Sequence, residues 1–249
     1  MTSQTLDRRR QSRDNHDSFA VDRAGFGNAE HSDWGHLGST NDLRPIRDLL
    51  VRQIKAAEVN SKPGWIVQIG ANGFQWTECI GRTMKSLHTE PGRSRPKLAI
   101  VDGSPSALQS ATEELRLQCL PEPDALRICH DGRFSLDGTA DVVFSFNAFA
   151  EFDLEVIANY FGTVARIIHP NGKFLVALAC EFDPTRADAD VSNDIRECPV
   201  FWSSEGPQFA EKIRAIVDRY FTLCVADVIP LQIGAGQVFV EFTRNAFQD

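Results

Sequence analysis

Short apolar runs alternate with amphipathic stretches along most of the chain after about residue 41. Several runs have the length and composition of buried strands, at residues 65–69, 97–101, 125–129, 141–146 and 173–180. Between them apolar residues recur at helical spacing, which predicts helices at about 41–54, 76–87, 104–119 and 154–168. This alternation is typical of a doubly wound, mostly parallel α/β sheet.

The last part of the chain departs from this alternation. After a helix expected at about 208–220, two strands at about 222–229 and 238–243 are separated by a short Gly-rich turn. Adjacent strands joined by a short turn predict an antiparallel hairpin, which would complete a seven-stranded sheet. Residues 183–205 are polar and irregular, and we expect them to form an insertion over the strand ends.

The beginning of the chain is different again. Residues 1–40 show almost no apolar periodicity and are rich in Asp, Ser and Asn, so we expect a disordered polar tail. Residues 41–249 would then form a single Rossmann-like domain, which the length of 249 residues allows.

Composition restricts the class of protein. A net charge of −8 and a pI near 5.3 argue against a nucleic-acid partner, whose binding depends on basic surface. We find no apolar run long enough to span a bilayer and no signal peptide, so we expect a soluble cytoplasmic protein without membrane contact. The six cysteines form no CxxC pair, so we expect reduced core thiols and no metal site. The oligomeric state is not indicated.

Three successive strands are followed by residues that suit a nucleoside. Ligands of open α/β sheets bind at the carboxyl ends of the strands. Gly70-Ala71-Asn72-Gly73 follows the first strand, and its small residues allow the backbone to approach a ligand closely. Asp102 ends the second strand, where a carboxylate can accept hydrogen bonds from both ribose hydroxyls. Asp131 follows the third strand and can accept one from an adenine amino group. Each alone would be an ordinary strand-end residue; together they predict a nucleoside site.

The order of these segments resembles that of class I S-adenosylmethionine-dependent methyltransferases, over about residues 41–244. The resemblance is carried by Val67-Gln68-Ile69-Gly70-Ala71-Asn72-Gly73, Val101-Asp102-Gly103-Ser104-Pro105, His130-Asp131-Gly132, the run from Asp141 to Asn147, and the run from His169 to Phe174. The terminal hairpin also matches the closing strands of that family. The first segment departs from the common pattern, which has an acidic residue at Gln68 and glycine at Asn72.

The resemblance implies S-adenosylmethionine as the cofactor and assigns residues to it. The turn Gly70, Ala71, Asn72 and Gly73 would line its methionine part. Asp102, with Gly103, would hold the ribose, and Asp131, with Gly132, would hold the adenine. Asn147 and Ala148 would lie beside the reactive end. The form Gln-Ile-Gly-Ala-Asn looks most like a branch that includes sugar and polyketide O-methyltransferases, which implies O-methylation of a small-molecule acceptor.

Methyl transfer needs no covalent intermediate, and a base helps only where the acceptor must lose a proton. Glu181 ends the fifth strand at the correct edge of the sheet, so we take it as the candidate acceptor-facing residue. Two other interpretations stay open. One is a binding or regulatory protein on a methyltransferase-like fold, without catalysis. The other is a nicotinamide-dependent oxidoreductase, although the Gly70 turn lacks the G-x-G-x-x-G spacing of that class.

Overall fold

The structure is a computed structural model, which describes residues 43–58, 64–71, 74–87, 95–146, 148–179, 215, 217–231 and 237–245. The expected tail at 1–40 and the expected insertion at 183–205 lie outside these residues. The helices and strands of the described part are α2 (Arg44–Glu58), β1 (Trp65–Ile69), α3 (Phe74–Ser86), β2 (Lys97–Asp102), α4 (Pro105–Leu117), β3 (Ala125–Ile128), β4 (Ala140–Ser145), η4 (Ala148–Glu151), α5 (Leu154–Ile167), β5 (Ile168–Ala179), β6 (Phe221–Leu231) and β7 (Gln237–Arg244).

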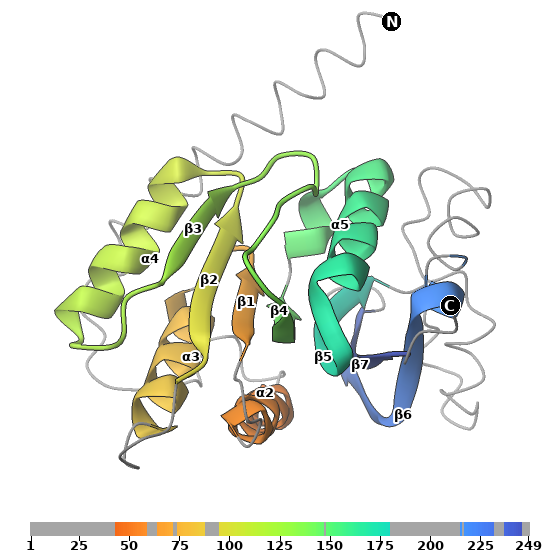
Figure 1. Ribbon diagram of the computed structural model, residues 1–249, viewed down its shortest axis with the longest axis horizontal. Helices are drawn as coiled ribbons and strands as arrows, with labels where there is room; N and C mark the ends of the chain where they lie inside the picture. The colour runs from red at the N-terminus through yellow and green to blue at the C-terminus, as the bar shows by residue number, and fades with distance from the viewer. Residues whose placement is uncertain are drawn as a thin grey trace, which may run out of the picture.

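The strands form one seven-stranded sheet in the order β3-β2-β1-β4-β5-β7-β6 (Figure 1). Strands β1 to β5 pair in parallel, whereas β7 is antiparallel to both β5 and β6. This confirms the predicted fold class, including the antiparallel hairpin at the end of the chain. The strand order reverses between β1 and β4, and such a reversal is where open α/β sheets bind ligands.

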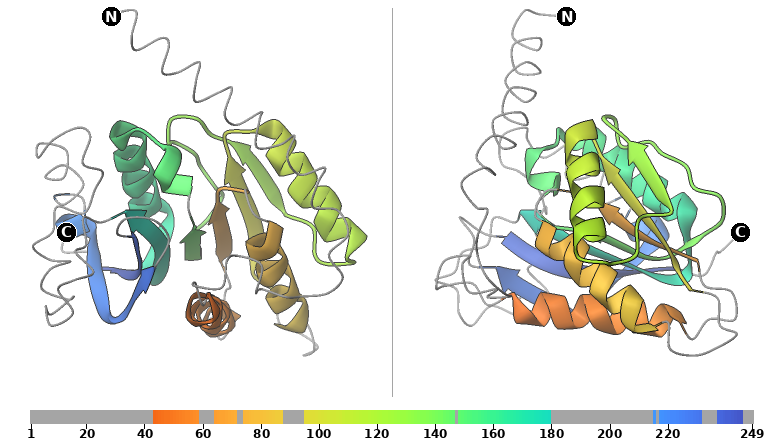
Figure 2. Two further views of the ribbon diagram at one scale, coloured as in Figure 1. Left: turned by 180° about the vertical axis from the view of Figure 1, so that it is seen from behind. Right: turned by 90° about the vertical axis from the view of Figure 1, so that its left-hand side faces the viewer.

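Each face of the sheet is covered by helices because successive strand residues point to opposite faces. Val67 and Ile69 of β1 belong to the core cluster under α5, whereas Ile66 belongs to the cluster under α2, α3 and α4. Figure 2 shows α2 and α3 together on one side of the sheet. The central strands β1, β2 and β4 are therefore buried on both faces, which explains why they are largely apolar in the sequence. The edge strand β3, expected to be buried, exposes Leu126 and Ile128.

The observed ends of the elements follow local chemistry. The side chain of Ser104 accepts a hydrogen bond from the backbone N–H of Ala107, at 3.2 Å, and Pro105 occupies the first turn of α4, so this helix starts as the sequence indicates. By contrast, β5 begins at Ile168 rather than near residue 173. Ile168 already pairs with Ala140 of β4 before a register shift, so the expected helix-ending segment at 169–172 continues the strand instead.

A buried carboxylate fixes α2 to the sheet. Glu241 of β7 is 1% exposed, and its Oε1 lies 2.8 Å from Nζ of Lys173 on β5. Nε2 of Gln53 on α2 donates to its Oε2, also at 2.8 Å, and the same lysine donates to Thr243 at 2.7 Å. Because both carboxylate oxygens and the charge are matched, this group acts as a structural bridge between helix and sheet.

The described cysteines are not all in the core. Cys79 of α3 and Cys129 are buried, but Cys119 is exposed in the turn after α4, so the expectation of core thiols is wrong for Cys119. Burial raises the pKa of the Cys79 thiol from 9.0 to about 11, so this thiol ionises in the folded chain only at a higher pH than usual. In the described ranges no helix has both the length and the apolar character to cross a membrane.

Candidate functional site

The turn after β1 begins with Gly70, whose φ of +88° is in the region that favours glycine. Its N–H donates to the carbonyl of Val101 on β2 at 2.8 Å. A Cβ on Gly70 would lie 2.6 Å from the Cβ of Ala148, the first residue of η4. The loops after β1 and β4 are therefore in close contact. Asn72, Gly73 and Asn147 lie outside the described residues, so their assigned roles stay predictions.

Gln68 supports the same turn from within β1. Its side chain is buried, and Nε2 donates to the carbonyl of Gly70 at 2.8 Å. No described residue donates to the other amide atom, Oε1, which is also buried. The amide therefore acts as a neutral donor here, at the position where the common methyltransferase pattern has an acidic residue. An ionised carboxylate cannot donate, so the position depends on the amide.

Asp102 joins the ends of β1 and β2. It is the last residue of β2 and is 5% exposed. Its Oδ2 accepts from the N–H of Ala71 at 2.6 Å, and its Oδ1 accepts from the N–H of Ser104 at 2.7 Å. None of the cationic side chains that the structure describes forms an ion pair with it. Each carboxylate oxygen keeps a further lone pair, so the group can still accept hydrogen bonds from a ligand.

The loops after β2 and β3 also lie together. The N–H of Cys129 donates to the carbonyl of Asp102 at 2.9 Å, and a Cβ on Gly103 would lie 3.1 Å from Nδ1 of His130. The next residue, Asp131, is exposed at its side chain. The structure thus brings the described members of the predicted cofactor site to neighbouring positions at one edge of the sheet: Gly70, Ala71, Asp102, Gly103, Asp131, Gly132 and Ala148.

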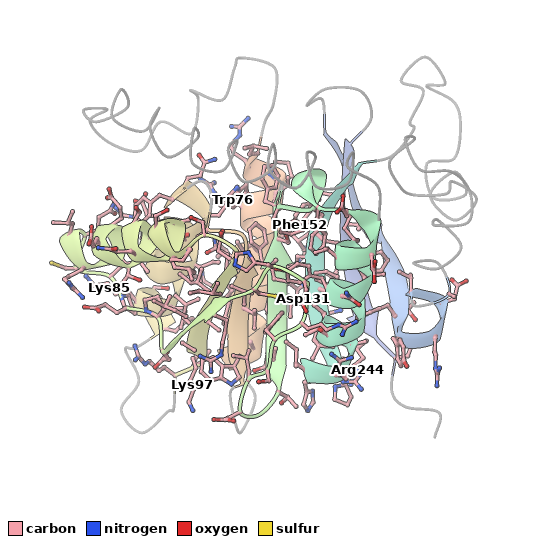
Figure 3. The ribbon with its side chains drawn as sticks, turned by 90° about the horizontal axis from the view of Figure 1, so that it is seen from above. Trp76, Lys85, Lys97, Asp131, Phe152 and Arg244 are labelled. Carbon is pink, nitrogen blue, oxygen red and sulfur yellow. The ribbon has the colours of Figure 1, made fainter. Side chains whose placement is uncertain are left out.

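The loop of Asp131 rests on α5, which the sequence did not indicate. Figure 3 shows Asp131 beside this helix. Gly132 has a φ of +79°, and a Cβ there would lie 2.4 Å from the carbonyl oxygen of Val156. The side chains of Asn159 and Tyr160 both reach back to this loop. In the sequence, only Gly132 indicated that another backbone approaches closely here. Its partners on α5 are distant in the sequence and belong to no motif, so no sequence signal indicated them.

Catalytic chemistry is less defined by the described residues. Glu181, the candidate acceptor-facing residue, lies outside the described residues. Within the described ranges, no three His, Cys, Asp or Glu side chains are grouped so that they could hold a metal ion. What the described edge offers is hydrogen-bond acceptors and tight turns, which suit binding of a polar ligand.

Comparison with known proteins places the fold. No protein-family model matches the sequence, and no curated protein matches it either. Solved structures do match. The N-methyltransferase NodS from Bradyrhizobium japonicum WM9, in complex with S-adenosyl-l-homocysteine, has a TM-score of 0.54 at 14% identity, over 88% of this chain and 94% of that chain.

Two further solved structures also match the fold of this chain. An S-adenosylmethionine-dependent methyltransferase from Clostridium acetobutylicum ATCC 824 has a TM-score of 0.55 at 10% identity, over 85% of this chain and 96% of that one. Magnesium protoporphyrin IX methyltransferase (ChlM) from Synechocystis PCC 6803, with bound SAM, has a TM-score of 0.51 at 11% identity, over 98% and 92%. At such identities the likeness concerns the fold alone. The chain has the fold of S-adenosylmethionine-dependent methyltransferases.

Proposed function

We propose that this chain is an S-adenosylmethionine-dependent methyltransferase that transfers the methyl group to an oxygen atom of a small-molecule acceptor. The observation that carries the proposal is Asp102, a nearly buried carboxylate at the end of β2 whose oxygens are oriented by the N–H groups of Ala71 and Ser104. It lies beside the strand-order reversal, where this fold class binds ligands. The related folds NodS and ChlM were solved with S-adenosyl-l-homocysteine or SAM bound, which supports the same cofactor here.

The residues at this edge fit such a cofactor. Asp102 keeps free lone pairs on both oxygens, so it can accept hydrogen bonds from the two ribose hydroxyls. Gly70 allows a tight turn against η4, and Asp131 offers an acceptor for an adenine amino group. When bound, the cofactor supplies an electrophilic methyl group on a sulfonium. The protein's part is to hold it in line with the acceptor and to exclude water.

The choice of an oxygen acceptor rests on the first motif and on Glu181. Gln68-Ile69-Gly70-Ala71-Asn72 resembles the branch that includes sugar and polyketide O-methyltransferases. In an O-methylation the acceptor oxygen forms a bond to the methyl carbon as the carbon–sulfur bond breaks, and its proton must leave. Glu181, which follows the end of β5 by two residues in the sequence, would accept that proton.

The fold bears differently on the two alternative functions, an oxidoreductase and a binding protein without catalysis. Strand β7 lies antiparallel between β5 and β6, unlike the all-parallel order of dinucleotide-binding dehydrogenases. Together with the missing G-x-G-x-x-G spacing, this disfavours a nicotinamide-dependent oxidoreductase. A binding protein without catalysis would use the same site at Asp102, so it differs from an enzyme only in turnover.

Calorimetric titration tests the cofactor. We expect the intact chain to bind S-adenosylhomocysteine, and Asp102→Ala to weaken this binding by about 100-fold, because it loses charge-assisted hydrogen bonds to the ribose. Asp137→Ala, which removes an exposed carboxylate before β4, is the matched control and should bind like the wild type. Absence of binding by the intact chain, or binding of NADH instead, would overturn the proposal.

A second measurement separates an enzyme from a binding protein. The chain is incubated with S-adenosylmethionine and a set of hydroxylated small molecules, and the release of S-adenosylhomocysteine is followed. An O-methyltransferase should produce it with at least one acceptor, and Glu181→Gln should slow the release by about 100-fold or more while leaving cofactor binding unchanged. Tight cofactor binding with no turnover on any acceptor would favour the binding protein.

A further inference from the structure

The segment between β3 and β4 that carries Asp131 is fixed to α5 at several points. Nδ2 of Asn159 donates to the backbone carbonyl of Asp131 at 2.9 Å. The hydroxyl of Tyr160 donates to the carbonyl of Cys129 at 3.3 Å, and Tyr160 is fully buried. Gly132 packs so closely on the helix backbone that no side chain would fit. The position of this loop is therefore set by α5 rather than by β3 alone.

The carboxylate of Asp131 is held at one oxygen only. The N–H of Arg133 donates to Oδ1 at 3.0 Å, and the thiol of Cys129 lies 4.0 Å from the same oxygen. No described residue donates to Oδ2, and the side chain is exposed. The loop thus fixes the orientation of the carboxylate and leaves one oxygen for an external donor. An exocyclic amino group of a purine is a donor of this kind.

We propose that Asn159 is a positioning residue that makes the site selective for a 6-aminopurine. It acts through Asp131: its amide holds the backbone of that residue, and Oδ2 of Asp131 then meets the amino group. The inference rests on the proposed cofactor and goes beyond it, because it assigns the selectivity for adenine to a side chain of α5. Asn159 contacts the backbone carbonyl of Asp131 and not its carboxylate, so its effect would be exerted through the loop.

The test compares two ligands on each variant. One is S-adenosylhomocysteine, and the other is its 6-desamino analogue, in which hydrogen replaces the amino group of the purine. The wild type should prefer the amino form by about 10-fold or more, as for a hydrogen bond to a charged acceptor. Asn159→Ala should reduce this preference to about 3-fold or less, mainly by weakening binding of the amino form. Because both affinities come from one preparation, the ratio does not depend on the fraction of folded protein.

Two further variants distinguish positioning from general damage. Asp131→Ala should abolish the preference. Arg166→Ala removes an exposed polar side chain in the last turn of α5, which donates to Thr163 at 2.9 Å and is not part of the Asp131–Asn159 contact, so it should retain the wild-type preference. If Asn159→Ala keeps the full preference, or if Arg166→Ala loses it as strongly, the proposal is wrong. A wild type that binds both ligands equally also overturns it while leaving the proposed function intact; a wild type that binds neither overturns the proposed function itself.

Discussion

Two nearly buried carboxylates, Glu241 and Asp102, are stabilised by different kinds of partner. Glu241, in the interior of β7, meets a lysine and a glutamine side chain, which satisfy its charge and both of its oxygens. Asp102, at the end of β2, meets two backbone N–H groups and no described cation. Burying a charge is costly unless it is paired or hydrogen-bonded, so both arrangements need their partners.

The two carboxylates differ in how far their charge is compensated and in where they lie on the sheet. The charge of Glu241 is compensated by Lys173, and its side chain is buried in the interior of the sheet, between partners from α2 and β5. Asp102 keeps lone pairs at the edge where the strand order reverses, and the N–H groups orient it without neutralising it. We therefore expect Glu241 to contribute to stability and Asp102 to contribute to ligand binding. The predictions below separate the two roles, beginning with the largest expected effect.

Removing the cation at Glu241 should damage stability but not binding. Lys173→Met leaves a buried carboxylate without its counter-charge and should cost about 3 kcal/mol of unfolding free energy, the low end of the usual range because Lys173 is partly exposed. Urea unfolding measures this cost, and the double variant Lys173→Met/Glu241→Gln should recover about half of it. The affinity for S-adenosylhomocysteine should stay within about 2-fold. A loss of affinity as large as that of Asp102→Ala would contradict the separation of roles.

Gln68→Glu would create a third buried carboxylate, one without the kinds of partner that Glu241 and Asp102 have. Gln68→Glu replaces the amide that donates to the carbonyl of Gly70 by a group that, when ionised, cannot donate. We expect a loss of about 2 kcal/mol at pH 8, from the unpaired charge and the unmet carbonyl. The introduced carboxyl should have a raised pKa, so its penalty should shrink as the pH falls toward 5. Gln68→Met, which removes the donor without adding charge, should lose about 1 kcal/mol at both pH values. Equal losses for the two variants at pH 8 would show that the charge is tolerated.

Cys79 is another buried ionisable group, and it avoids the cost of a buried charge by remaining uncharged. Its pKa is raised to about 11 in the folded chain against 9.0 as the ordinary value, because burial disfavours the thiolate. The unfolded chain therefore releases this proton first as the pH rises, and stability is lost between pH 9 and pH 11. The loss from this thiol should be about 1.4 kcal/mol at pH 10.

Urea unfolding at pH 8 and pH 10 measures this loss, with Cys79→Ala as the comparison. Burial also raises the pKa of Tyr160 well above its usual range, which adds to the alkaline loss in both proteins alike. The difference in slope between the two proteins therefore isolates Cys79. Equal slopes would mean that the thiol ionises as readily in the folded chain as in the unfolded one.

The sequence predicted the parallel sheet well, because strands such as β1 and β4 are buried on both faces and consist mostly of apolar residues. It also predicted that Gly70, Asp102 and Asp131 stand at or shortly after the ends of successive strands. It did not predict Asn159, Gln53 or Lys173 as partners of those or other carboxylates. Such contacts depend on how helices pack on the sheet, and an isolated polar residue on a helix carries no signal of its distant partner.

The bond between Asp102 and Ala71 joins positions 31 residues apart, across the helix that links β1 and β2. It can form only after the two strands have paired in parallel and the intervening segment has closed, a step that is slow compared with local helix formation. During refolding, recovery of ligand binding should therefore lag behind recovery of helical circular dichroism and coincide with completion of the β1–β2 pair. Formation of the Asp102–Ala71 hydrogen bond, at the carboxylate that would bind the ribose, therefore marks the completion of folding in this part of the chain.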